Sequence, residues 1–182
     1  ENFLELFERR VFLELGDIQN ESLFEDKARA DYWQNQIDVI IHAAASTNLL
    51  LSQDKIDPIN VGGTGNILRF ARKIPSKRLV YVSTYTVMGD KHLDADFILD
   101  EAHYDIGQGF DDMTYKRTKF ISERLVRNAQ DVDWTIVRPG QIFGESTTGK
   151  YPFSKPSVMG IFYDLIKTAV DTQLAIRSEY YF

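Results

Sequence analysis

The stretch Asp38-Val39-Ile40-Ile41-His42-Ala43-Ala44-Ala45 decides the fold, because an unbroken apolar run passes directly into small residues. Such a run is typical of a strand buried on both faces of a parallel sheet. Similar runs predict strands at 11–15, 78–83 and 133–138. Periodic apolar residues predict helices between the strands, one capped by Ser22 and others at 59–74, 112–128 and 158–174. This alternation predicts an α/β fold, a doubly wound parallel sheet with helices on both faces.

Composition restricts both the domain organisation and the possible ligands. The chain has 182 residues, 43% of them apolar, which predicts one domain with one core. Its net charge of −6 argues against a nucleic-acid partner, because binding to phosphate backbones needs a basic face. No apolar run approaches the ~20 residues of a membrane span, so we expect no membrane partner. A chain without cysteine fits a cytoplasmic location, and its three scattered histidines predict no metal site.

Four clusters of small or polar residues directly follow the predicted strands, at 16–18, 42–46, 83–86 and 138–141. In an open parallel sheet, ligands bind beyond the carboxyl ends of the strands, so we expect these clusters to line one crevice. The run from Ala43 to Ala45 would let a flat ligand approach the backbone. Close packing of a helix on the strand would explain the same small residues.

Tyr115 and Lys119 stand one helical turn apart on one face of the predicted helix 112–128. A phenol beside an ammonium is an acid–base unit, and at ~5 Å the cation should lower the phenol pKa by about two units. The hydroxyl of Thr84, at the end of the preceding strand, can donate to a substrate carbonyl oxygen. Together the three side chains predict a site that protonates a carbonyl oxygen during its reduction.

The order and spacing of six motifs resemble the extended short-chain dehydrogenase/reductase superfamily, a Rossmann-fold group. These motifs lie at residues 16–18, 42–44, 60–64, 82–84, 115–119 and 138–140. The resemblance implies that Tyr115 is the proton donor and that Thr84 orients the carbonyl group. It also implies that Lys119 holds the nicotinamide ribose and tunes Tyr115.

The same resemblance implies a cofactor site along the ends of the strands. Asp17 and Ile18 would contact the adenine, while Asn60 would be a polar anchor near the site or serve a purely structural role. The residues that would line the rest of the cofactor are His42, Ala43, Ala44, Ala45, Pro139, Gly140 and Ile142.

Three segments look most like the thioester reductase domains of nonribosomal peptide synthetases and carboxylic acid reductases. They occupy residues 83–87, 114–123 and 136–140. This narrower resemblance implies reduction of an acyl thioester to an aldehyde, with further reduction to the alcohol left open, and favours NADPH over NAD. The implied partner is an acyl or peptidyl carrier domain that presents the substrate on phosphopantetheine.

The glycine-rich phosphate loop of the superfamily is missing from its expected place before Val11. The run Gly63-Thr64-Gly65 imitates its first half, but it lies in a predicted helix and Leu68 replaces the third glycine. We therefore expect residues 1–182 to form one incomplete NAD(P)-binding domain. Its first βαβ unit and most of its substrate-binding lobe would be absent, with the start of that lobe at 145–182.

Two other functions remain open on the sequence. A nucleotide-sugar epimerase or dehydratase, or a ketone reductase, would use the same side chains at Thr84, Tyr115 and Lys119. A sensing or assembly protein without enzymatic activity, built on a degenerate Rossmann fold, would explain the missing phosphate loop. The three intact side chains favour an enzyme.

Overall fold

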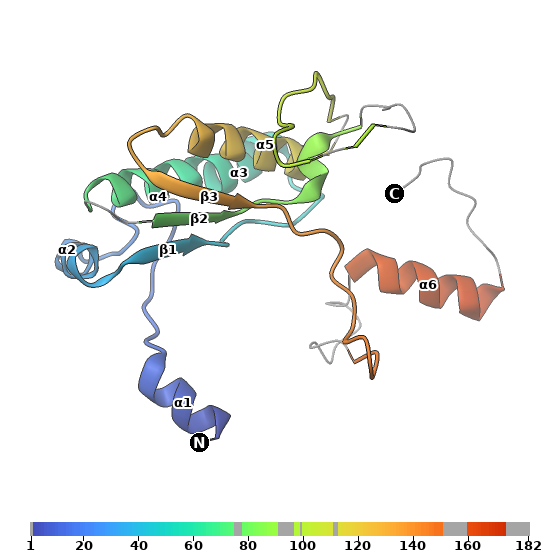
Figure 1. Cartoon of the computed structure of the whole chain (residues 1–182), viewed down its shortest axis with the longest axis horizontal. Helices are drawn as coiled ribbons and strands as arrows, with labels where there is room; N and C mark the ends of the chain where they lie inside the picture. Colours follow the sequence, from blue (N-terminus) through green and yellow to red (C-terminus); the bar gives the residue numbers. More distant parts are fainter. Residues whose placement is uncertain are drawn as a thin grey trace. The chain divides into compact units, whose positions relative to one another are not determined.

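The computed structural model describes residues 2–74, 78–90, 97–98, 100–110, 113–150 and 160–173, and it divides into two compact units, Glu1–Gly140 and Gln141–Phe182. The first unit contains a parallel sheet with the strand order β1-β2-β3 (Figure 1). Its strands are β1 (Val39–His42), β2 (Arg78–Val82) and β3 (Asp133–Val137). In this register His42 pairs with Tyr81, and Tyr81 pairs with Ile136. The α/β class and the parallel sheet are therefore confirmed.

Helical segments connect the strands. The helix α2 (Lys27–Gln36) precedes β1, and its N-cap is Asp26, whose carboxylate accepts the Ala28 N–H, so the expected cap at Ser22 is wrong. Between β1 and β2 lie α3 (Gln53–Asp57), the π-helical turn η1 (Pro58–Gly62) and α4 (Gly63–Arg72). Between β2 and β3 lie the 3-10 turn η2 (Tyr85–Met88) and α5 (Thr114–Arg127).

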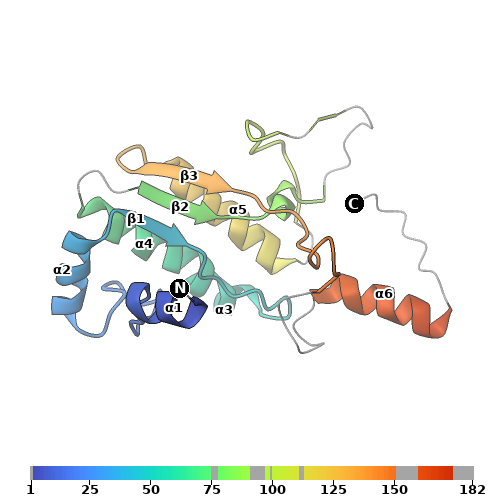
Figure 2. The ribbon, with the colours of Figure 1, turned by 60° about the horizontal axis from the view of Figure 1, so that its bottom comes forward.

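The helices α4 and α5 cover one face of the sheet (Figures 1 and 2). Leu79 and Tyr81 point from β2 into this layer and are buried with Leu68 of α4 and Val126 of α5. On the other face, the Ile41 side chain is 68% exposed. Helices were expected on both faces, but the described part of the first unit covers only one.

The strand expected at 11–15 is wrong. These residues follow the helix α1 (Phe3–Arg10), which the sequence analysis did not predict, and they form no part of the sheet. Leu13 and Leu15 are almost fully exposed. An apolar run becomes a strand only when another strand supplies hydrogen bonds for its backbone, and among the described residues β1 pairs with β2 alone.

The second unit contains the helix α6 (Gly160–Thr172), close to the expected helix at 158–174. A tight turn precedes it, in which the Glu145 N–H donates to the Lys150 carbonyl at 2.8 Å. The Glu145 carboxylate accepts a hydrogen bond from the Thr148 hydroxyl and others from the N–H groups of Thr147 and Thr148. These bonds, of which the one from the Thr148 hydroxyl has the largest effect, lower the pKa of Glu145 to about 2.

Candidate active site

The loops that follow the three strands meet at one edge of the sheet, because the strands are parallel and in register. Two backbone hydrogen bonds join the loops after β2 and β3. The Ser83 N–H donates to the Val137 carbonyl at 2.8 Å, and the Tyr85 N–H donates to the Pro139 carbonyl at 3.3 Å. Thr84 therefore lies beside the expected cofactor-lining residue Pro139.

Lys119 is buried between α5 and the end of β2. Its ammonium donates a 2.7 Å hydrogen bond to the Val82 carbonyl and lies 4.3 Å from the centre of the Tyr81 ring. Burial lowers the pKa of Lys119 to about 8, against the opposing influence of the Glu123 carboxylate. The ammonium is thus fixed at the strand end where a cofactor is expected.

Tyr115 lies in the first turn of α5 and is partly buried. Its hydroxyl has no hydrogen-bond partner among the residues that the structure describes, so this donor is available to a ligand. Burial raises the pKa of Tyr115, so the expected lowering by Lys119 is wrong. The reason is physical: desolvation of the phenolate dominates, and the Lys119 ammonium is held on Val82 and Tyr81.

The residues around Tyr115 in the first turn of α5 are each tied to another segment. The Thr114 hydroxyl donates to the Leu51 carbonyl at 2.9 Å. The Lys116 ammonium pairs with Asp90 at 2.8 Å, and the Arg117 guanidinium pairs with Asp57 at 3.3 Å. The backbone that carries Tyr115 is thereby held in place, while its hydroxyl makes no hydrogen bond to the residues that the structure describes.

Thr84 ends the loop after β2 and caps the short turn η2. Its hydroxyl oxygen accepts the Thr86 N–H at 3.3 Å and lies 3.1 Å from the Thr86 hydroxyl. The side chain is partly exposed, so it combines this capping role with access to a ligand. It stays a prediction that the hydroxyls of Thr84 and Tyr115 both bind the same ligand atom.

Asn60 is buried in the π-helical turn and joins the loop after β1 to α5. Its side-chain oxygen accepts the Ser46 N–H at 2.7 Å, and its side-chain amide donates to the Ser46 carbonyl at 3.1 Å. The same amide donates to the Thr118 hydroxyl at 2.9 Å. Asn60 therefore fixes the cofactor-side loop relative to the helix that carries Tyr115 and Lys119.

His42, the last residue of β1, points its ring into the helix layer. The Thr64 hydroxyl donates to the Asn60 carbonyl, so the Nε2–H of His42 donates to Thr64, at 3.0 Å. Burial, assisted by the Lys119 charge, lowers the pKa of His42 to about 4. The imidazole is a neutral part of the core, and only its backbone is left to face a cofactor.

The remaining residues of the expected cofactor site are placed as follows. Ala43 and Ala44 are exposed beyond β1, and Ala45 is partly exposed. Asp17 is exposed, whereas Ile18 lies on Gly63 and its carbonyl accepts the Asn66 side-chain amide at 2.7 Å. Pro139 and Gly140 are exposed at the end of the first unit. Ile142 belongs to the second unit and is 68% exposed.

Glu123 has the densest set of polar contacts at this edge of the sheet, and the sequence analysis assigned it no role in the site. Its side chain is fully buried in α5. It accepts hydrogen bonds from Ser83, Arg127 and Arg138, at 2.8, 2.9 and 2.5 Å. Its pairing with Arg127, four residues further along α5, is visible in the sequence, but Ser83 and Arg138 approach it from the ends of β2 and β3.

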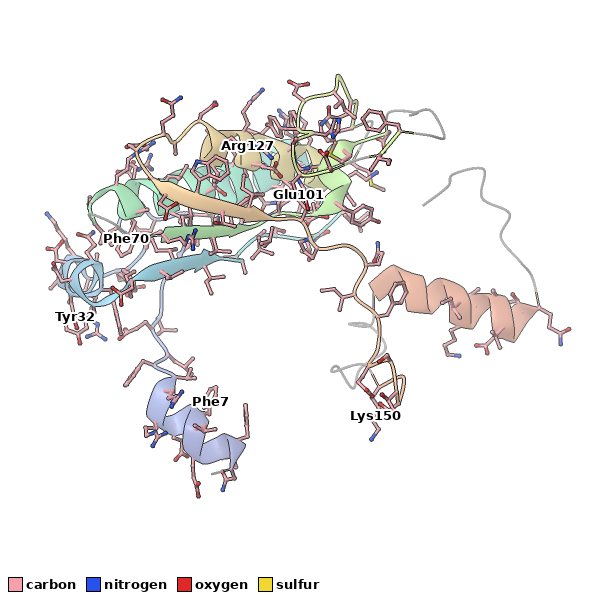
Figure 3. The ribbon with its side chains drawn as sticks, viewed as in Figure 1. Phe7, Tyr32, Phe70, Glu101, Arg127 and Lys150 are labelled. Atoms are coloured by element: carbon pink, nitrogen blue, oxygen red, sulfur yellow. The ribbon has the colours of Figure 1, made fainter. Side chains whose placement is uncertain are left out.

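Arg138 and Arg127 extend this cluster to the segment after η2. The Arg138 guanidinium also donates to the His103 carbonyl at 2.8 Å. Arg127 donates to the Glu101 carbonyl at 3.5 Å, and both residues are labelled in Figure 3. The Arg127 guanidinium also lies over the Tyr104 ring, 4.8 Å from its centre. The ends of β2 and β3, the segment at 101–104 and α5 therefore share one buried ionic cluster.

A cavity of about 260 Å³ lies away from these residues. Its walls are mainly apolar and come from the segment at 12–24, α2, β1 and α4, and none of the expected site residues lines it. Within the described ranges, no group of acidic residues and histidines could hold a metal ion. In the same ranges, no helix has the length and hydropathy needed to cross a membrane.

Comparison with known proteins shows that this chain is similar to reductase domains. Peramine synthetase A of Epichloe festucae is 34% identical over 119 residues, which are 62% of this chain and 4% of that protein. Glycine betaine reductase of Emericella nidulans is 36% identical over 119 residues, 63% of this chain and 9% of that protein. The chain thus spans a small part of the curated relatives that it matches.

Solved structures give the same result. A thiolation-reductase di-domain from an archaeal nonribosomal peptide synthetase matches 94% of this chain and 45% of its own, with 26% identity and a TM-score of 0.76. The terminal R domain from the myxalamid pathway matches 94% of this chain and 42% of its own, with 28% identity and a TM-score of 0.75. The UDP-glucose 4-epimerase of Brucella ovis, at 20% identity and a TM-score of 0.63, shares the Rossmann-like fold alone.

The family assignment rests on almost the whole chain. The NAD-binding family model described as "Male sterility protein" matches residues 1–178. This family and the similar reductase domains are NAD(P)-dependent oxidoreductases of the short-chain dehydrogenase/reductase type, in agreement with the six motifs. The chain therefore belongs to the male sterility family of NAD-binding proteins.

Proposed function

We propose that this chain is part of an NADPH-dependent reductase that converts a carrier-bound acyl thioester into an aldehyde. The observation that carries this proposal is the free hydroxyl of Tyr115, held on a helix start whose neighbouring side chains are all engaged. A partly buried donor without a partner in the described structure is suited to a ligand oxygen. The similarity to nonribosomal peptide synthetase reductase domains supports a thioester as the substrate.

The residues at the strand ends fit a nicotinamide cofactor. The small, exposed residues at 43–45 leave the backbone open to a flat ring, and the exposed segment at 139–140 offers a second wall. Lys119 would donate to the nicotinamide ribose, and Asp17 and Ile18 would contact the adenine. When bound, the cofactor supplies a hydride.

In the proposed reaction, the thioester carbonyl carbon accepts the hydride while its oxygen accepts the Tyr115 proton. Thr84 donates a hydrogen bond to the same oxygen and stabilises the negative charge that develops there. The product is a hemithioacetal, whose carbon–sulfur bond then breaks to give the aldehyde and the free carrier thiol. The Lys119 ammonium, fixed on the Val82 carbonyl, would hold the ribose of the cofactor during this step.

The proposed partner is a carrier domain that bears the acyl chain on phosphopantetheine. The thiolation-reductase di-domain among the similar structures supports this choice, because its thiolation domain and reductase domain are parts of one protein. Within the described residues of this chain, the exposed strand-end loops are where such a substrate arm would arrive.

The test is a substrate comparison with the intact protein. We expect consumption of NADPH with an acyl-pantetheine thioester, release of an aldehyde and weaker activity with NADH. UDP-glucose and a simple ketone are the comparison substrates for the epimerase and ketone reductase alternatives. Turnover of either one without turnover of the thioester would reject the proposal.

A further inference from the structure

Glu123 is a buried carboxylate whose cost of burial is offset by two guanidinium groups and one hydroxyl group from three places in the fold. Two guanidinium groups, Arg127 and Arg138, and the Ser83 hydroxyl all donate to it. Burial alone would raise the pKa of Glu123, but the bonds from Arg138, Ser83 and Arg127 outweigh it and hold the pKa below its ordinary value. Glu123 is therefore an anion at neutral pH.

This anion touches the residue next to Thr84. The Ser83 hydroxyl donates to Glu123 at 2.8 Å, and Ser83 is itself buried at the point where β2 ends. Arg138 binds the same carboxylate from the end of β3. A shift of Glu123 would thus move the start of the loop that carries the Thr84 hydroxyl.

Glu123 also faces Lys119 from one turn further along α5. Among the residues that the structure describes, His42 of β1 and Tyr81 of β2 also face the Lys119 ammonium. His42 is neutral because its pKa is about 4, and burial raises the pKa of Tyr81 far above neutral pH. Tyr115, on the preceding turn, also has a raised pKa. Within the described ranges, Glu123 is therefore the negative charge that acts on Lys119.

We propose that Glu123 is a positioning residue of the reductase site, which fixes Thr84 through Ser83 and supplies the negative charge that faces the Lys119 ammonium. This inference rests on the proposed function. A carboxylate with a purely structural role would contribute to folding stability, but it would affect neither the pH dependence of turnover nor the rate at saturating substrate.

The experiment measures kcat and KM of the intact protein between pH 6 and 10, with NADPH and an acyl-pantetheine thioester. In Glu123→Gln, which keeps the size of the side chain, we expect the alkaline fall in kcat to move about one pH unit lower. The alkaline fall begins at a lower pH because Lys119 loses its proton more readily without the facing anion. Ser83→Ala should lower kcat about five-fold, leave KM for NADPH unchanged and keep the wild-type pH limit.

Arg127→Gln is the matched control, because it removes one partner of Glu123 and leaves the carboxylate charge in place. Its alkaline limit should not fall below that of the wild type, because the carboxylate charge remains, even if its thermal midpoint falls. Coincident pH profiles of Glu123→Gln and the wild type would overturn the inference.

Ser83→Ala keeps the inference testable should Glu123→Gln fail to fold, since a near-native kcat in that variant would also overturn it. An intact wild-type protein that does not turn over the thioester at all would overturn the proposed function itself. An active wild type whose variants have the same kcat and the same pH profile as the wild type would instead overturn only the inference about Glu123.

Discussion

Lys119 donates its hydrogen bond to Val82, the last residue of β2, so the ammonium is fixed by the backbone of the strand that leads to Thr84. This bond places the charge at the carboxyl edge of the sheet without using an acidic partner at that point. The burial that accompanies it brings the pKa of Lys119 down to about 8.

The first prediction follows from that pKa. Lys119 is charged below about pH 8 and neutral above it, so turnover should decline as the pH rises through 8. In Lys119→Arg the charge persists across this range, so the decline at pH 8 should disappear, although the longer side chain lowers the rate. Initial rates of NADPH oxidation by the intact protein from pH 6 to 10 would reveal it. A decline that survives in Lys119→Arg belongs to another group.

The second prediction concerns the proton donor. Tyr115→Phe keeps the ring and removes the hydroxyl, so turnover should fall by about 10²–10⁴-fold, while binding of the thioester changes little. Tyr104→Phe is the matched control, because the Tyr104 hydroxyl donates to the Phe120 carbonyl and lies outside the proposed site. Single-turnover rates with a bound acyl-pantetheine substrate separate the two. Near-native turnover by Tyr115→Phe would show that Tyr115 is structural.

The third prediction uses the buried imidazole of His42. Its pKa is about 4 in the folded state and about 6.5 in the unfolded chain, so the unfolded chain takes up the proton first as the pH falls. The resulting stability is fully present above pH 6.5 and is lost progressively towards pH 4, by about 3 kcal/mol.

His42→Gln keeps a donor for Thr64 but cannot titrate in this range. The free energy of unfolding in urea, measured at pH 7 and at pH 4.5, should therefore fall less in the variant than in the wild type. Equal losses in the two proteins would mean that His42 does not titrate as described.

The fourth prediction compares two glycines of α4. A Cβ at Gly63 would lie 2.7 Å from the end of the Ile18 side chain, whereas a Cβ at Gly65 would meet nothing within 4 Å. Gly63→Ala should therefore destabilise the protein by about 1–3 kcal/mol and weaken cofactor binding by displacing Ile18. Gly65→Ala should stabilise α4 by up to ~1 kcal/mol. Thermal unfolding and NADPH titration of the two variants measure the changes in stability and in cofactor affinity. Equal stability and equal affinity in the two variants would contradict the packing described.

The strands at 39–42, 78–82 and 133–137 could be predicted because burial within a parallel sheet demands continuous apolar runs, and each run is visible in the sequence. The same rule failed at 11–15, since an apolar run does not reveal whether a neighbouring strand is present. The helix α1 was missed although Asn2 and Glu5 form a capping box, because its apolar side chains are largely exposed.

Spacing alone indicated that Tyr115 and Lys119 share a helix face, but their electrostatics depended on neighbours that are distant in sequence. A pairwise Coulomb estimate left out the burial of Tyr115 and the capture of Lys119 by Val82. The role of Glu123 was equally inaccessible, because Ser83 and Arg138 approach it only after β2 and β3 have paired.

The π-helical turn at Pro58–Gly62 has a consequence for how the chain tolerates insertion and deletion. A π turn holds one residue more than an α turn, so loss of a single residue there would leave a regular helix. That deletion would nevertheless rotate everything before it by about 100° relative to α4. The contacts of Asn60 with Ser46 and Thr118 could then no longer form at the same time as the contact of Thr64 with His42. Length in this short turn is therefore under tighter constraint than the identity of the exposed residues at 47–50.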